Sequence, residues 1–172
     1  MTAMIASQSG LTVEERLDIQ ELFANYCWSL NTGDADGYVE CFARDGWLEH
    51  FPPKRYTGRD QIRSEMLPTL WYGRPHAFMG RQHHPHNFLM QREGDLIRAK
   101  VQCSVTRLDP TNNTFSVFLL VHWDVMCAKE EGRWRFKSMQ ITHWFRHETP
   151  WIGDPKARLV LPGDENKKRG EF

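Results

Sequence analysis

The stretch that decides the fold is residues 96–108, LIRAKVQCSVTRL. Its side chains alternate in character: the apolar ones are Ile97, Ala99, Val101, Cys103 and Val105, and the polar ones are Arg98, Lys100, Gln102, Ser104 and Thr106. Successive side chains of a β-strand point to opposite faces, so this pattern predicts a long strand with one buried face and one face at least partly in contact with water.

Three further stretches with extended patterns flank this strand. They cover residues 83–91, 114–129 and 133–147, with turn-forming residues at 93–95, 109–113 and 130–132. Short turns between consecutive strands are typical of an antiparallel meander. The second stretch is apolar on both faces around Phe118 to Val121, which predicts a strand that is central in the sheet or lies under a subunit contact.

The chain before the meander has helical signals. Thr12 and Glu15 form a capping-box pattern, which predicts a helix that begins at Thr12. Apolar residues follow with helical spacing at Leu17, Leu22, Phe23, Tyr26 and Leu30. Gly33 is suited to end this helix, and Asp34 or Asp36 to cap a second, short one.

Between this helical hairpin and the meander we expect a short strand at residues 47–51, ended by two prolines, and a third helix at 58–67, broken by Pro68. The fold class is therefore α+β. One domain at residues 12–150 accounts for these elements, with a flexible N-terminus at 1–11 and a partly disordered C-terminal extension at 151–172.

Composition describes one soluble domain and excludes several classes of partner. The 172 residues contain 22 Lys and Arg against 22 Asp and Glu, and the mean hydropathy is −0.61. A balanced charge argues against a nucleic-acid partner. The chain has neither an apolar run long enough to span a membrane nor a secretory signal, so we expect a cytoplasmic protein.

The cysteine, tryptophan and histidine content suggests what lies inside the domain. Four scattered cysteines suggest reduced core residues. Seven Trp and eight His suit an apolar pocket with a few titratable groups.

Several segments together resemble the SnoaL-like branch of the nuclear-transport-factor-2-like (NTF2-like) superfamily, which includes polyketide cyclases, ketosteroid isomerases and scytalone dehydratases. The similar segments are residues 26–37, 41–46, 56–62, 81–87, 121–123 and 132–136, ending near Trp144. The resemblance spans residues 12–147. It implies a cone, in which about three N-terminal helices close a strongly curved antiparallel or mixed sheet around an apolar cavity, and usually a dimer through the outer face of the sheet.

The resemblance also implies two site residues in the first half of the chain. Tyr26 matches the tyrosine that donates a hydrogen bond to the substrate oxygen in ketosteroid isomerases, and His50 stands where those isomerases have the aspartate that moves the proton. An imidazole has a pKa near neutrality, so His50 keeps that role possible. The alternatives are a core Tyr26 bonded to a backbone carbonyl and a solvent-facing His50 beside Glu49.

Two more histidines are implied in the second half. His122 matches the second oxyanion donor of the isomerases, its alternative being a buried histidine paired with a carbonyl or with Asp124. His83 matches the general acid/base histidine of scytalone dehydratase and a related dehydrochlorinase. Those lyases orient that histidine with an aspartate on the first helix, where Asn25 or Trp28 stands here. Unless Asp124 or Glu49 substitutes, a lyase mechanism needs another orienting group.

His83, His122 and His143 facing one cavity would form a metal-binding set, but their spacing matches no local ligand motif, so we expect no metal and no cofactor. We expect the substrate to contact Phe23, Trp28, Trp47, Asn87, Leu120 and Trp144.

The function implied is a cofactor-independent acid/base enzyme, an isomerase, dehydratase or cyclase, acting on a hydrophobic oxygenated small molecule such as a polyketide, a steroid-like or an aromatic compound. The alternatives are a non-catalytic small subunit of an aromatic-ring-hydroxylating dioxygenase and a small-molecule-binding protein. The apolar residues from Phe118 to Val121 exceed what one sheet face needs to bury, so we expect a homodimer or a higher homo-oligomer.

Overall fold

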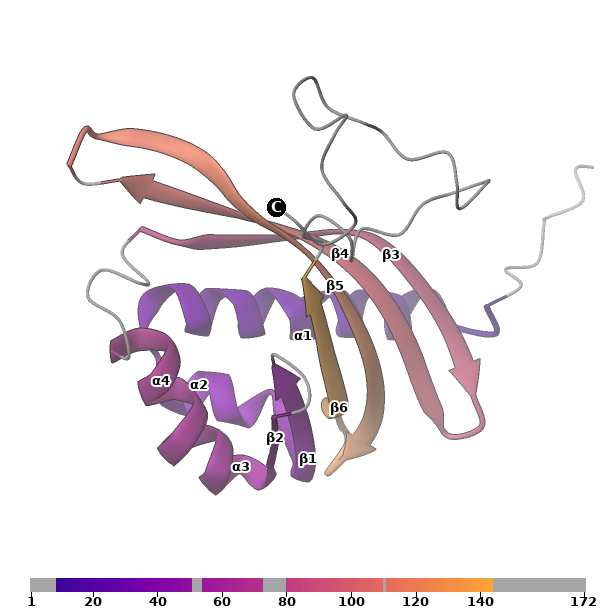
Figure 1. Ribbon diagram of the computed structural model, residues 1–172. Helices are drawn as coiled ribbons and strands as arrows, with labels where there is room; N and C mark the ends of the chain where they lie inside the picture. Colours follow the sequence, from indigo (N-terminus) through magenta and orange to yellow (C-terminus); the bar gives the residue numbers. More distant parts are fainter. Residues whose placement is uncertain (1–8, 51–53, 73–79, 110, 144–172) are drawn as a thin grey trace, which may run out of the picture.

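The computed structural model describes residues 9–50, 54–72, 80–109 and 111–143. They form a six-stranded curved sheet in the order β2-β1-β6-β5-β4-β3, and helix α1 lies across its concave face (Figure 1). The strands are β1 (Phe42–His50), β2 (Arg55–Thr57), β3 (Gln82–Glu93), β4 (Leu96–Asp109), β5 (Thr114–Glu130) and β6 (Arg133–His143). The helices are α1 (Val13–Thr32), α2 (Ala35–Glu40), α3 (Gly58–Gln61), the π-helical turn η1 (Ile62–Met66) and α4 (Leu67–Tyr72).

The sheet is mixed. β1 pairs in parallel with β6, whereas the pairs β1–β2, β3–β4, β4–β5 and β5–β6 are antiparallel. The predicted α+β class, with a curved sheet and N-terminal helices, is confirmed. The meander strands match their predicted ranges closely over the described residues, and the predicted residues 144–147 lie outside them. β1 begins five residues earlier than expected, at Phe42, because it pairs there with Phe136 of β6.

The predicted start of α1 is confirmed. Thr12 accepts a hydrogen bond from the backbone N–H of Glu15, and the Glu15 carboxylate accepts one from the backbone N–H of Thr12. At the other end Gly33 adopts a left-handed conformation, φ 80°, and its N–H bonds to the carbonyl of Ser29. The buried residues of α1 face the sheet: Ile19, Leu22, Phe23, Tyr26, Cys27, Ser29 and Leu30.

The third helix differs from its prediction. Pro68 does not end it, because the helix changes to π-type hydrogen bonding over Ile62–Met66 and α4 then begins at Leu67. Pro68 therefore occupies the first turn of a new segment, where a missing N–H is tolerated.

The core lies between α1 and the concave face, and its inner part is a cluster of aromatic rings. These are Phe23, Tyr26, Tyr38, Phe42, Trp123 and Phe136. Phe136 of β6 has its ring centroid 4.9 Å from that of Phe23 and 5.5 Å from those of Tyr26 and Phe42. Rings in this range attract one another in addition to excluding water, so the cluster fixes α1 on the sheet.

The ends of the chain fall mostly outside the described residues, including all of the predicted extension at 151–172. Residues 9–11, which the sequence assigns to a flexible N-terminus, are attached to β3: the Ser9 carbonyl accepts from the Arg92 N–H at 2.9 Å, and Leu11 is buried. Within the described part of the chain, none of the helices is both long and apolar enough to cross a membrane.

Replacing Phe136 with Ala removes a ring that contacts three others, and we expect it to lower the free energy of unfolding by about 3–5 kcal/mol. Leu89→Ala is the matched control, because Leu89 is 69% exposed and its loss should cost less than about 0.5 kcal/mol. Urea unfolding of both variants measures the difference. Equal effects would contradict the aromatic cluster as the main tertiary contact.

Candidate active site

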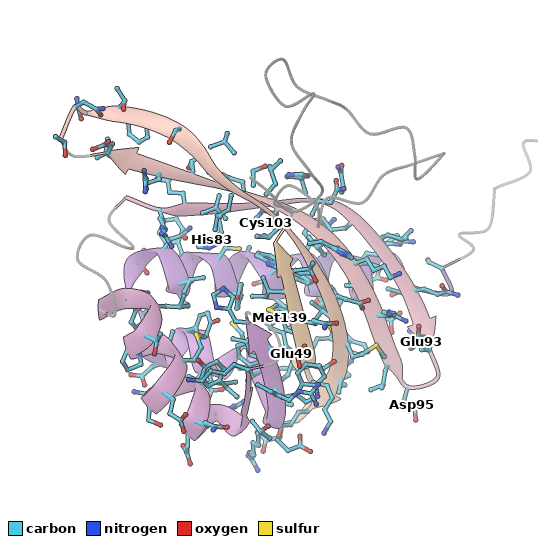
Figure 2. The ribbon with its side chains drawn as sticks, in the orientation of Figure 1. Glu49, His83, Glu93, Asp95, Cys103 and Met139 are labelled. Carbon is cyan, nitrogen blue, oxygen red and sulfur yellow. The ribbon has the colours of Figure 1, made fainter. Side chains whose placement is uncertain are left out.

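All six strands of the sheet bring one of their ends to the same end of the sheet. β1, β4 and β6 finish there, and β2, β3 and β5 begin there. The C-terminal end of α1 lies against it, since Asn31 contacts His83 at the start of β3. We call the concave side of this end the mouth. In Figure 2, His83 and Cys103 lie beside α1, whereas Glu93 and Asp95 lie at the opposite end of the β3–β4 hairpin.

His83 is held at the mouth by two hydrogen bonds to a single atom. The side-chain oxygen Oδ1 of Asn31 lies 3.2 Å from the backbone nitrogen of His83 and 2.7 Å from its ring nitrogen Nδ1. A backbone N–H only donates, so the atom that faces it must be the amide oxygen rather than the amide nitrogen. That oxygen only accepts, so Nδ1 carries the ring hydrogen. Nε2 is therefore the nitrogen without a hydrogen, and it is the basic nitrogen of the ring.

Burial sets the charge of His83. It lowers the pKa of the imidazole to about 3, and the positive charge of Arg81 and the neighbouring His84 add to this effect. His83 is therefore neutral at pH 7, and its Nε2 is able to accept a proton. The neutral Asn31 orients the ring and supplies no negative charge to stabilise an imidazolium ion.

Asn31 is the orienting residue that the sequence interpretation missed. That interpretation considered Asn25 and Trp28, but both are exposed on α1, Trp28 by 73%.

The two carboxylates considered as substitutes bond to other residues. Asp124 bonds to Arg98 at 2.6 and 2.9 Å, and Glu49 bonds to Arg55 and to Gln140. The available signal was the position of Asn31 in the last turn of α1, two residues before Gly33.

Tyr26 points from α1 into the core and is 1% exposed. Its hydroxyl oxygen lies 3.2 Å from that of Tyr38 and accepts that hydrogen bond, which leaves the hydrogen of Tyr26 to be donated elsewhere. Burial raises the pKa of both phenols far above neutrality, so both stay protonated. Cys103 contributes to the raised pKa of Tyr26, and it lies two residues before Val105, the strand partner of His83. Tyr26 and His83 thus approach the same face of β4.

His50 ends β1 and lies opposite Ile141 of β6, on the same strand face as the buried Leu48. This is the concave face, so His50 and His83 lie on one face of the sheet. Phe23, an expected substrate contact, is also on this side, where its ring packs against Phe88 and Trp123.

His122 lies on the convex face, opposite to the position expected for an oxyanion donor beside Tyr26. Trp123 points into the core, where its ring contacts Tyr26, and the alternation of the strand turns His122 outward. There it stands between Gln102 and Thr142 in the strand register. Burial lowers its pKa, which the charge of Asp124 partly opposes.

Other expected substrate contacts lie away from the mouth as well. Leu120 points outward like His122, two residues further along the strand, and Leu119 packs against the core instead.

Two more of the expected contacts lie on other strands. Asn87 is exposed in a β-bulge and donates to Gln102 at 2.6 Å. Trp47 faces outward beneath the guanidinium group of Arg55, 3.8 Å from its ring centroid. Trp144 lies outside the described residues, as does the side chain of His143.

Metal binding has no support in the described residues, since no group of three or more His, Cys, Asp or Glu side chains there could hold an ion. The four cysteines are reduced and buried. Burial raises the thiol pKa of each of them, to about 12 for Cys41 and Cys103.

The lowered pKa of His83 makes stability depend on pH. An unfolded histidine has a pKa of about 6.5, whereas folded His83 has one of about 3, so between these values the unfolded chain binds the additional proton. The stabilising effect of a neutral His83 is present above pH 6.5 and is lost as the pH falls towards 3, by up to about 1.4 kcal/mol per pH unit. Urea unfolding from pH 7 to pH 4 should show a steeper slope in the wild type than in His83→Gln, where the lowered pKa of His122 still contributes. His84→Gln is the control and should keep the wild-type slope.

Comparisons with known proteins identify the fold and the family. A structure of a variant of Rv3472 from Mycobacterium tuberculosis, a protein of unknown function, has a TM-score of 0.67 and 24% identity over 85% of this chain and 81% of that chain. ActVI-ORFA from Streptomyces coelicolor has a TM-score of 0.67 and 18% identity over 75% of this chain and 97% of that one. A type 2 hexachlorocyclohexane dehydrochlorinase, LinA, has a TM-score of 0.62 and 11% identity over 77% and 87%.

These structures share the fold, and one of them is an enzyme by name. No curated protein matches the chain. The family model described as the SnoaL-like domain matches residues 11–140, more than half of the chain. The chain therefore belongs to the SnoaL-like domain family.

Proposed function

We propose that this protein is a cofactor-independent enzyme in which His83 acts as a general base on a hydrophobic, oxygenated small molecule at the mouth. The observation that carries the proposal is the double hydrogen bond from His83 to Asn31, because it fixes one tautomer and leaves Nε2 basic. A histidine that only filled space would not need its ring held in one tautomer. The lowered pKa supports the same role, since the base is unprotonated at neutral pH.

The chemistry is the removal of a proton from carbon. Nε2 forms a bond to hydrogen as the C–H bond breaks, and the electron pair moves toward an adjacent carbonyl oxygen. The hydroxyl group of Tyr26 is the donor to that oxygen, because its own oxygen already accepts from Tyr38. Return of the proton to another carbon gives isomerisation, and loss of hydroxide from the next carbon, taken up with the proton as water, gives dehydration.

The absence of a negative charge on Asn31 limits this base. An imidazolium ion buried without a carboxylate gives up its proton readily, so His83 suits a reaction in which the proton is held only briefly. A weak base also requires a substrate whose C–H bond is acidic. His50 is the other candidate base, since it lies on the same face of the sheet at the end of β1.

The test uses a substrate found by screening carbonyl-bearing polyketides and phenols. We expect His83→Gln to lower kcat on the order of 10²-fold or more, and Tyr26→Phe to lower it as well. His84→Gln is the matched control: it removes the next histidine, which faces outward and bonds to Thr106, and should leave kcat unchanged. A folded His83→Gln variant with near-normal kcat would overturn the proposal, and loss of activity only in His50→Gln would assign the base to His50.

Asn31→Asp is the second arm of this test. A carboxylate next to the ring should raise the pKa of His83 by roughly 1–3 units, which moves the acidic limb of the profile of kcat/KM against pH upward. Asn31→Leu should remove the orienting bonds and lower kcat. An unchanged pH profile in Asn31→Asp would contradict His83 as the titrating base.

We also propose a homodimer through the convex face of the β4–β5 hairpin. Figure 1 shows this hairpin projecting beyond the other strands, and Phe115, Val117 and Leu120 are exposed on its convex side. Sedimentation at micromolar concentration should show a dimer for the wild type and a monomer for Val117→Asp. A wild-type monomer would contradict this. Co-purification with a large oxygenase subunit would favour the alternative, a non-catalytic small subunit.

A further inference from the structure

A stripe of apolar side chains runs along the outer side of α1. Val13, Leu17 and Trp28 are each more than half exposed, and Ala24 between them is exposed as well. These four residues, which we call the outer stripe, recur at intervals that place them on one side of a helix with 3.6 residues per turn. The opposite side of α1 packs on the sheet with apolar residues of its own (Figure 1). Packing in the core therefore does not explain the outer stripe.

A groove follows the outer stripe on one side. Its volume is about 550 Å³, and it lies between α1, α2 and the start of β6. Trp28 belongs both to the stripe and to the lining of the groove, so the two form one continuous surface. Neither Asn31 nor His83 lines the groove, and this surface is therefore separate from the mouth.

The side of α1 between the stripe and the groove is acidic. Asp18 and Glu21 line the groove, and Glu14 continues the row one turn earlier. Within the described part of the chain these three carboxylates have neither a hydrogen bond nor an ion pair, whereas the neighbouring Glu15 is paired with Arg92. The fold thus leaves a row of negative charge beside an apolar stripe.

The opposite wall of the groove offsets only part of this charge. Arg135 is engaged by Glu40, so Arg133 is the basic lining residue that has no ion pair with a described residue. Three negative charges against one positive charge favour a basic partner, because complementary charge steers association and like charge disfavours it.

Charge argues against two other occupants of this surface. A second copy of the chain, packed antiparallel about a two-fold axis, would bring two identical acidic rows together. An anionic lipid surface would be repelled in the same way. A protein helix with one apolar face, bordered by Lys or Arg, matches both the stripe and the charged row. The stripe extends over 15 residues of α1, or about 22 Å, which is enough for about four turns of such a helix.

We propose that the outer stripe and its groove are a docking surface for another protein, whose docked segment is a basic amphipathic helix. Its apolar face covers Val13, Leu17 and Trp28, and its Lys or Arg side chains lie against Asp18 and Glu21. Trp28 is the principal anchor, since large aromatic residues contribute most of the binding energy at such interfaces. The docking surface does not depend on the enzymatic function proposed above.

Fluorescence anisotropy with synthetic peptides tests this proposal on the intact protein. The probe is a labelled amphipathic helix of about 18 residues, with Leu on one face and Lys at the borders of that face. The comparison peptide has Glu in place of every Lys. We expect saturable binding of the Lys peptide, and binding of the Glu peptide that is weaker on the order of 10-fold or more.

Variants on the surface identify where the Lys peptide binds. Trp28→Ala should lower the affinity on the order of 10-fold. Asp18→Asn combined with Glu21→Gln should lower the affinity and also weaken its dependence on salt. Leu89→Ala and Asp95→Asn are the matched controls, because they remove an exposed apolar and an exposed acidic side chain from the β3–β4 hairpin. Both should leave the affinity unchanged.

Several outcomes would overturn the proposal: no saturable binding, equal affinity for the two peptides, or an equal loss in the control variants. A wild-type dimer that Trp28→Ala converts to a monomer would assign the surface to a second copy instead. Displacement of the peptide by tetramethylammonium, at a concentration where NaCl has no effect, would assign it to a small organic cation. If Trp28→Ala does not fold, Leu17→Gln should give the same loss of affinity for the Lys peptide.

Discussion

The packing of α1 across the concave face is the constraint on which the rest of the structure depends. Phe23 and Tyr26 anchor the middle of the helix among the rings of Trp123 and Phe136. Because a helix is rigid over this length, fixing its middle also fixes its last turn. Asn31 is carried to the start of β3 in this way, and the α4 side chain Trp71 secures the same region by donating to the Leu30 carbonyl at 3.2 Å.

The contact between Asn31 and His83 determines how strong the proposed base can be. An amide and a carboxylate have almost the same shape, and either can hold an imidazole by an oxygen atom. Only the carboxylate adds a charge that stabilises the protonated ring. With an amide the tautomer is specified but the basicity is not increased. In the proposed mechanism, activation must then come from the substrate, whose C–H bond has to be acidic.

The elements that could be predicted from the sequence are those with local signals. The capping box defines the start of α1, and strict alternation defines β4. It was harder to predict which face of the sheet each side chain of β5 occupies. That strand is apolar on both faces, so the pattern does not show which of its residues enter the core. Trp123 enters the core, so the neighbouring His122 points to the opposite face. The site depended on a contact between residues 31 and 83, which no local pattern contains.

The parallel pairing of β1 with β6 also determines when folding can finish. Phe42 pairs with Phe136, so β1 is synthesised long before the strand that completes it. β1 gains its neighbour β6 only after the residues of β3, β4 and β5 have been synthesised. Contacts between residues so distant in the sequence make folding slow and leave early segments open to aggregation. The pairing of β6 is thus the step that completes the packing of the first part of the chain.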